Sequence, residues 1–93
     1  MASTGELMTE TLHSKLTAAF APEYIAIIDE SESHRGHAGW REGGGTHFRV
    51  EMRSAAFDGM GRVARSRAVH RVLREELDGS IHALTLELSG SGG

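Results

Sequence analysis

The residues best suited to chemistry in this chain are its six histidines, because the sequence contains no cysteine. His34, His37 and His47 fall within one glycine-rich stretch, Ser33 to Val50, which also holds the only tryptophan, Trp40. A neutral imidazole binds a transition metal through one nitrogen and leaves the other for a hydrogen bond. Two histidines without a thiolate do not complete a four-ligand structural zinc site. Any metal here therefore needs further ligands, from acidic side chains or from a partner.

His82 is an unusual residue for its surroundings, since it shares alternation with Leu84, Leu86 and Leu88. The residue pattern alone favours a histidine at the rim of the core, hydrogen-bonded to a backbone carbonyl. The alternative is a metal ligand held on a rigid strand end. His47 alternates with Arg49, which predicts a solvent-facing side chain and a reserve ligand. The two histidines that we interpret as helix-surface residues are His13 and His70.

Arginines crowd into a second stretch, and five of them lie between Arg62 and Arg74. One interpretation is a solvated helix face with an ordinary i, i+4 pair of Arg71 and Glu75. The other is a set of phosphate contacts through Arg65, Arg67 and Arg71. The formal net charge of −3 does not suggest attraction of the whole surface to nucleic acid. We find no nucleophile with a base at motif spacing and no cofactor fingerprint, so we do not expect an enzyme.

Hydrophobic spacing predicts the elements that position these residues. Apolar side chains at every fourth position, Met8 to Phe20, indicate an amphipathic helix that ends at Ala21-Pro22. Apolar residues of both parities in the first strand suggest that both of its faces are covered. The predicted helices are 6–20 and 62–77, the second of which ends at a C-cap glycine, Gly79, and the predicted strands are 24–30, 46–53 and 81–88. We expect Phe57 to anchor a turn or short helix at 54–61. Residues 31–45 are predicted to form a mobile loop, and 1–5 and 89–93 flexible tails.

The order helix, strand, strand, helix, strand predicts an α+β fold in one domain spanning 1–93. The first two strands should form an antiparallel hairpin, and the intervening helix lets the last strand run parallel to the second. We therefore expect a three-stranded mixed sheet with its helices packed on one face. The sequence has no signal peptide, no apolar run long enough for a membrane span and no cysteine for disulfides, so we expect a cytoplasmic protein.

Six short motifs, in this order and at this spacing, resemble the BolA-like family from about Leu12 to Leu88. They are IDES (28–31), GHAG (36–39), GGTHFRV (44–50), FDG (57–59), REEL (74–77) and IHAL (81–84). One departure is Arg65-Ser66-Arg67, where the family usually has Arg-His-Arg.

The resemblance implies a fold similar to class II KH domains and a non-enzymatic role in iron-sulfur cluster assembly, trafficking or iron sensing. It implies a monomer that forms a heterodimer with a monothiol glutaredoxin around a shared [2Fe-2S] cluster, with glutathione supplied by the partner. By motif position the metal ligands of this chain correspond to His37 and His82, with His34 and His47 in reserve. Some members of the family are described as DNA-binding transcription regulators, which makes DNA the alternative partner, through Arg65, Arg67 and Arg71.

Overall fold

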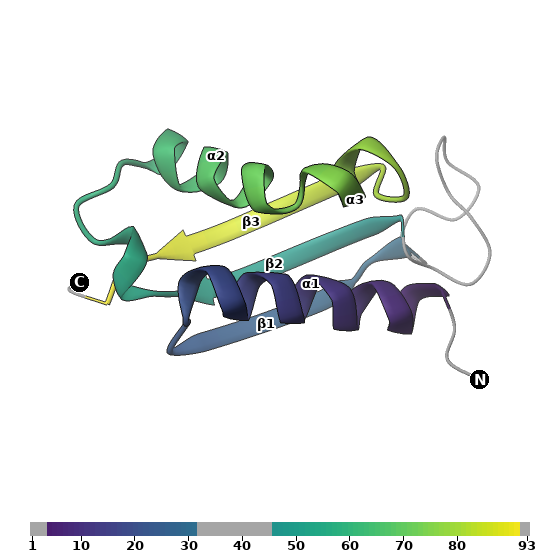
Figure 1. Cartoon of the computed structure of the whole chain (residues 1–93), viewed down its shortest axis with the longest axis horizontal. Helices are drawn as coiled ribbons and strands as arrows, with labels where there is room; N and C mark the ends of the chain where they lie inside the picture. The colour runs from purple at the N-terminus through teal and green to yellow at the C-terminus, as the bar shows by residue number, and fades with distance from the viewer. Residues whose placement is uncertain (1–3, 32–45, 92–93) are drawn as a thin grey trace.

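A computed structural model describes residues 4–31 and 46–91 (Figure 1). The predicted order of elements is confirmed, with a short 3-10 helix in the turn after the second strand. The elements are α1 (Thr4–Phe20), β1 (Tyr24–Asp29), β2 (His47–Arg53), η2 (Ala55–Phe57), α2 (Arg62–Val72), α3 (Arg74–Asp78) and β3 (Ala83–Ser89). None of the helices in the described part of the chain is long and apolar enough to cross a membrane.

The three strands form one sheet in the order β1-β2-β3. β1 is antiparallel to β2, with Ile27 opposite Val50, and β3 is parallel to β2, with Leu86 beside Val50. The predicted hairpin and the predicted parallel crossover are both confirmed. Helix α1 packs along β1 and helix α2 along β3, so that the central strand lies beneath both (Figure 1).

The core lies between the helices and one face of the sheet. Leu12 and Leu16 of the predicted helical stripe are fully buried, while Met8 and Phe20 pack at its margin. Alternation along β2 places every second side chain inward, as predicted. The buried apolar residues are Leu12, Leu16, Phe48, Val50, Met52, Phe57, Val69, Leu73 and Ile81.

The other face of the sheet is open, and here the prediction that both faces of β1 are covered is wrong. Tyr24 is 44% exposed and Ile28 is 41% exposed on that face. Helices α1 and α2 pack on the same side of the three strands, and no other element in the described part of the chain covers these two side chains. On the open face Arg49 of β2 instead pairs with Glu87 of β3, with 2.5 Å between Nη1 and Oε1.

Several predicted boundaries shift. The single helix 62–77 is two helices, because Leu73 (φ −100°, ψ 19°) leaves the helical conformation as its side chain enters the core. Helix α1 already begins at Thr4, within the predicted tail. Residues 89–91 of the predicted tail are also attached to the domain. Ser89 belongs to β3 and its carbonyl accepts a hydrogen bond from Ser54 N, and the Ser91 hydroxyl donates to Glu23.

An ion pair joins α1 to α3 and gives a prediction for alkaline pH. Lys15, the only lysine, donates from Nζ to Glu76 Oε2 at 2.7 Å. This hydrogen bond is the main cause that holds the pKa of Lys15 above its ordinary value of 10.5, against an opposing effect of desolvation. The folded chain therefore binds this proton more tightly than the unfolded chain. The resulting stability is fully present below pH 10.5 and is lost as the pH rises through the higher folded pKa.

We expect the urea midpoint of the wild type to fall more steeply than that of Lys15→Arg between about pH 9 and about pH 11.5, because arginine keeps its charge throughout. Lys15→Met, which has no proton to lose, should be the less stable variant at pH 9 and should show no additional loss. Parallel slopes for the wild type and Lys15→Arg would contradict the assignment of this alkaline loss to Lys15.

Candidate metal-ligand site

His82 lies on a bend immediately before β3, and its side chain is exposed. Its backbone N–H donates to the carbonyl of Thr46 at 2.7 Å, and the N–H of Ala83 donates to the same oxygen at 3.1 Å. Alternation with Leu84 predicted that His82 would face the core. The buried residue here is instead Ile81, one position earlier. The bend therefore turns the imidazole outward while its main chain stays fixed to the neighbouring strand. This is a suitable placement for a ligand offered to a partner.

His47 is buried, with only 4% of its surface exposed, so the prediction of a solvent-facing side chain is wrong. It alternates with Arg49, as predicted, but it is the first residue of β2, and its ring lies against Thr46 and the ring of His82. Its Nδ1 lies 2.8 Å from Thr46 Oγ1. His13 and His70 are exposed on α1 and α2, as predicted.

The structure brings His47 and His82 together at one end of the sheet. Their ring centroids are 5.3 Å apart and their planes are tilted by 53°. Two of the predicted ligand residues, His34 and His37, lie outside the described residues, as does Trp40. The structure thus pairs the principal predicted ligand with a reserve one.

Two hydroxyl residues, Ser31 and Thr46, form a cluster beside this pair of histidines. The sequence pattern did not predict this cluster. Ser31 Oγ accepts hydrogen bonds from the backbone N–H groups of Thr46 (3.1 Å) and His47 (3.2 Å), and lies 3.2 Å from Thr46 Oγ1. Both residues are almost fully buried. Their positions in the sequence could have indicated it, because Ser31 comes directly before segment 32–45 and Thr46 directly after it. That segment, with His34 and His37, therefore begins and ends at this cluster.

The donor set fits a metal centre that is completed by another molecule. Among residues 4–31 and 46–91 there is no group of three or more histidine, aspartate or glutamate side chains that could hold a metal ion. An exposed imidazole on a fixed backbone supplies one nitrogen ligand of the kind that replaces cysteine on one iron of some [2Fe-2S] centres. The described residues alone therefore do not form a complete metal site.

The arginine surface is less uniform than the sequence suggests. Arg65 is half-buried and donates from Nε to Phe57 O (3.2 Å) and from Nη1 to Leu88 O (3.4 Å). These contacts join α2 to β3 and use two of the N–H groups of the guanidinium. Arg65 therefore stabilises the packing of α2 in this structure. Arg67 and Arg71 are exposed on α2. Of the three predicted phosphate contacts, two are therefore presented to solvent.

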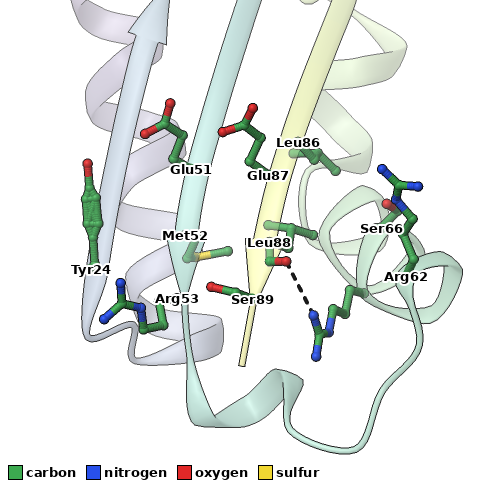
Figure 2. Close-up of a pocket in the computed structure, with 11 residues that line it drawn as sticks. Tyr24, Glu51, Met52, Arg53, Arg62, Ser66, Leu86, Glu87, Leu88 and Ser89 are labelled. Carbon is green, nitrogen blue, oxygen red and sulfur yellow. Dashed lines mark hydrogen bonds between the residues drawn. The ribbon is translucent and has the colours of Figure 1, made fainter. Parts of the chain in front are cut away.

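A cavity of about 470 Å³ lies at the opposite end of the sheet from His82, beside the start of α2. Figure 2 shows Glu51 and Glu87 extending side by side from β2 and β3, with Arg62 and Ser66 contributed by α2. Arg65 and Leu88 also line the cavity, and the hydrogen bond from Arg65 Nη1 to Leu88 O joins them (dashed line in Figure 2). Because both carboxylates and guanidinium groups line the cavity, its charge is mixed and does not favour anions alone.

Comparison with known proteins identifies relatives along most of the chain. A family model described as "BolA-like protein" matches residues 16–91. An uncharacterized protein of Sinorhizobium sp is 46% identical, covering 91% of this chain and 92% of its own length. BolA-like protein 1 of Mus musculus is 41% identical over 82% of this chain, which spans about half (53%) of that protein.

Two further comparisons concern structure and a named role. The solved structure of BolA1 from Arabidopsis thaliana superposes with a TM-score of 0.80 at 33% identity, covering 91% of this chain and 93% of that one. The protein of Vibrio cholerae named DNA-binding transcriptional regulator BolA is 35% identical, over 86% of this chain and 72% of its own length. The α+β fold with a three-stranded mixed sheet is that of the solved BolA1 structure.

Proposed function

This chain belongs to the BolA-like family, and on that premise we propose that it is a cytoplasmic, non-enzymatic iron-sulfur adaptor. It pairs with a monothiol glutaredoxin around a bridging [2Fe-2S] cluster, in cluster assembly, trafficking or iron sensing. His82 is the first ligand from this chain and His37 the second, with His34 and His47 in reserve. The partner and its bound glutathione supply the thiolates.

The observation that carries this proposal is the outward-facing imidazole of His82 on an anchored main chain. Two backbone N–H groups, those of His82 and Ala83, are fixed by one carbonyl, so the ring starts from a defined place. An exposed histidine at the rim of a domain costs little to present and is accessible to a second protein. Preorganisation of this kind lowers the entropic cost of forming a shared site.

The composition of the donor set supports a shared cluster in particular. The chain has no cysteine, and a [2Fe-2S] centre held only by histidines has no parallel in the usual ligand sets, which are Cys₄ or Cys₂His₂. When bound, such a cluster supplies one-electron redox chemistry or a transferable iron-sulfur unit. This chain's part is to provide nitrogen ligands, which raise the potential of the iron they bind.

Co-reconstitution with a monothiol glutaredoxin and glutathione tests the proposal. The apoproteins are mixed, iron and sulfide are supplied under reducing, anaerobic conditions, and the product is followed by size-exclusion elution and visible circular dichroism. We expect a heterodimer whose spectrum differs from that of the glutaredoxin's own cluster. Unchanged elution together with an unchanged spectrum would reject the adaptor function for this chain.

A second candidate function is DNA binding in transcription regulation, favoured by the name of the Vibrio cholerae relative and by the exposed Arg67 and Arg71. Exposed guanidinium groups on one helix face bind phosphates without reading sequence. Arg65, occupied by two backbone carbonyls, contributes less than the sequence suggests.

If this chain binds DNA through α2, the double variant Arg67→Ala/Arg71→Ala should bind more weakly at all salt concentrations. The slope of log affinity against log salt should become shallower by roughly 1.8, since each lost phosphate contact contributes about 0.9. Fluorescence anisotropy with a duplex across a salt series measures this slope. Glu51→Gln, on the open face of the sheet, is the control; equal slopes for both variants and the wild type would exclude α2 as the DNA contact.

A further inference from the structure

Helix α3 is too short to be stable through its own hydrogen bonds, since it has only five residues, Arg74–Asp78. Its place in the domain therefore depends on contacts with its neighbours. Leu73, directly before the helix, is fully buried, and Leu77 packs against the core. A further contact is the ion pair between Glu76 of α3 and Lys15 of α1, at 2.7 Å.

Glu76 contacts α1 through its side chain and the approach to β3 through its main chain. Its Oε2 accepts a hydrogen bond from Lys15 Nζ, which lies farther, 3.8 Å, from the exposed carboxylate of Glu75. The backbone carbonyl of Glu76 accepts from the N–H of Ile81 at 2.9 Å. Because Ile81 directly precedes His82, one residue connects α1 with the main chain beside the proposed ligand.

Three consecutive backbone N–H groups are fixed where the chain enters β3. The N–H of Ile81 donates to Glu76, and those of His82 and Ala83 donate to the carbonyl of Thr46. Because each peptide group is planar, bonds to the peptides on both sides of a residue restrain its two backbone torsions. The Thr46 carbonyl restrains His82 in this way, and the Glu76 carbonyl adds the same restraint at Ile81. Without the bond from Glu76, the direction from which the chain reaches His82 is less restrained.

Stability alone does not account for this ion pair. Glu76 is only 9% exposed, and its second oxygen, Oε1, is buried without a hydrogen-bond partner among the described residues. Burying a carboxylate with an unsatisfied oxygen offsets much of what its pairing contributes. Burial of Leu73 and Leu77 is not directional, so it sets how deeply α3 packs and not its rotation. The charge-assisted hydrogen bond to Lys15 is directional and adds that restraint.

We propose that Glu76, held by Lys15, is a positioning residue for His82. The ion pair fixes α3 against α1, and the Glu76 carbonyl then fixes the main chain at Ile81, so that the imidazole of His82 leaves the domain from a defined place. This inference rests on the proposed function, because it assigns the residues that place the principal ligand. The competing explanation is that burial of Leu73 and Leu77 is enough to hold α3.

Native-state amide hydrogen exchange of the metal-free chain, at about pH 7, where lysine and glutamate are both charged, tests the link from the ion pair to Ile81. The amide of Ile81 is the reporter, and the amide of Val50, in the central strand, reports global unfolding. In Lys15→Met we expect the protection of Ile81 to fall about tenfold more than that of Val50, as the loss of one charge-assisted hydrogen bond predicts. Equal losses at both amides, or no loss, would overturn the inference.

Three further variants identify the cause. Lys15→Arg keeps the positive charge and should keep the wild-type difference between the two amides. Glu76→Gln keeps the size of the side chain and removes its charge, so it should lower the protection of Ile81 as Lys15→Met does. The matched control is Arg74→Met, which removes the exposed ion pair of Arg74 with Asp78 from the same helix and should leave the difference unchanged. An equal effect of Arg74→Met would overturn the specific role of the Lys15–Glu76 pair.

The second measurement is cluster-dependent formation of the heterodimer with a monothiol glutaredoxin, titrated by visible circular dichroism. We expect Lys15→Met to bind about tenfold more weakly, the low end of the cost of losing a group that supports a metal ligand. Lys15→Arg and Arg74→Met should bind as the wild type does. Wild-type affinity in a Lys15→Met variant that has lost the protection of Ile81 would overturn the positioning of His82.

These outcomes separate the inference from the proposed function, because hydrogen exchange needs neither metal nor partner. A wild type that forms no shared cluster would reject the proposed function, and with it the role of His82 as ligand. A wild type that forms the cluster, but in which the protection of Ile81 does not depend on Lys15, would reject only the positioning by Glu76.

Discussion

Replacing His82 by alanine should abolish the spectral change that this chain induces in a glutaredoxin-bound [2Fe-2S] cluster. The side chain is exposed and its anchoring contact uses only the backbone N–H, so alanine removes the imidazole and keeps the main-chain hydrogen bonds to Thr46. Loss of a group that merely supports a metal ligand typically costs about 10–100-fold in affinity. Removal of the ligand itself should cost at least as much in cluster-dependent heterodimer formation, measured by titration with visible circular dichroism.

His13→Ala is the matched control, since it also removes an exposed imidazole, from α1. It should behave as the wild type in the same titration. Urea unfolding of the two apo variants should agree within about 0.5 kcal/mol, as is usual for exposed positions. If His82→Ala and His13→Ala both retained the wild-type spectrum, His82 would not be a ligand, and the segment containing His37 would become the principal candidate.

Replacing Phe57 by alanine should destabilise the fold by about 3–5 kcal/mol, the usual cost of removing a buried phenylalanine ring. Phe57 is fully buried, and its ring centroid lies 4.9 Å from that of Phe20 at the end of α1. Its carbonyl also receives the Nε–H of Arg65. Because small domains are stable by only about 5–15 kcal/mol, this single change should remove a large fraction of the total.

Urea denaturation followed by far-ultraviolet circular dichroism measures this loss. Val63→Ala, at a position that is 62% exposed on α2, is the control and should change the free energy of unfolding by less than about 0.5 kcal/mol. A loss below about 1 kcal/mol for Phe57→Ala would mean that the turn 54–61 does not anchor the core as the structure indicates.

The fold could be predicted because its signals are local. The four-residue spacing of Leu12 and Leu16 identified a helix and its buried face, and alternation around Val50 identified the central strand. A helix between the second and third strands was enough to predict parallel pairing. The break at Leu73 carried no such signal, since neither glycine nor proline marks it, and the conformation there accompanies burial of the side chain.

The site was less predictable, because its key features arise where alternation ends. The alternation along the second strand predicted that the side chain of His47 would face solvent, yet it is buried. Ser31, sixteen positions earlier, accepts a hydrogen bond from the backbone N–H of His47. Parity also placed His82 with Leu84, whereas β3 begins only at Ala83 and the preceding bend turns the imidazole outward. A resemblance in motif pointed to His82 as a ligand, but only the structure identified its neighbours. The role of His37 stays a prediction, since it lies outside the described residues.

Electron–nuclear double resonance on the reduced cluster of the heterodimer, with ¹⁵N-histidine incorporated into this chain only, tests most directly whether this chain supplies a histidine ligand. We expect a ¹⁵N coupling of the size produced by a nitrogen bound directly to iron, and we expect this coupling to disappear when labelled His82→Ala replaces the wild type. A reduced heterodimer cluster with no ¹⁵N coupling from this chain would contradict the claim that the chain supplies a histidine ligand.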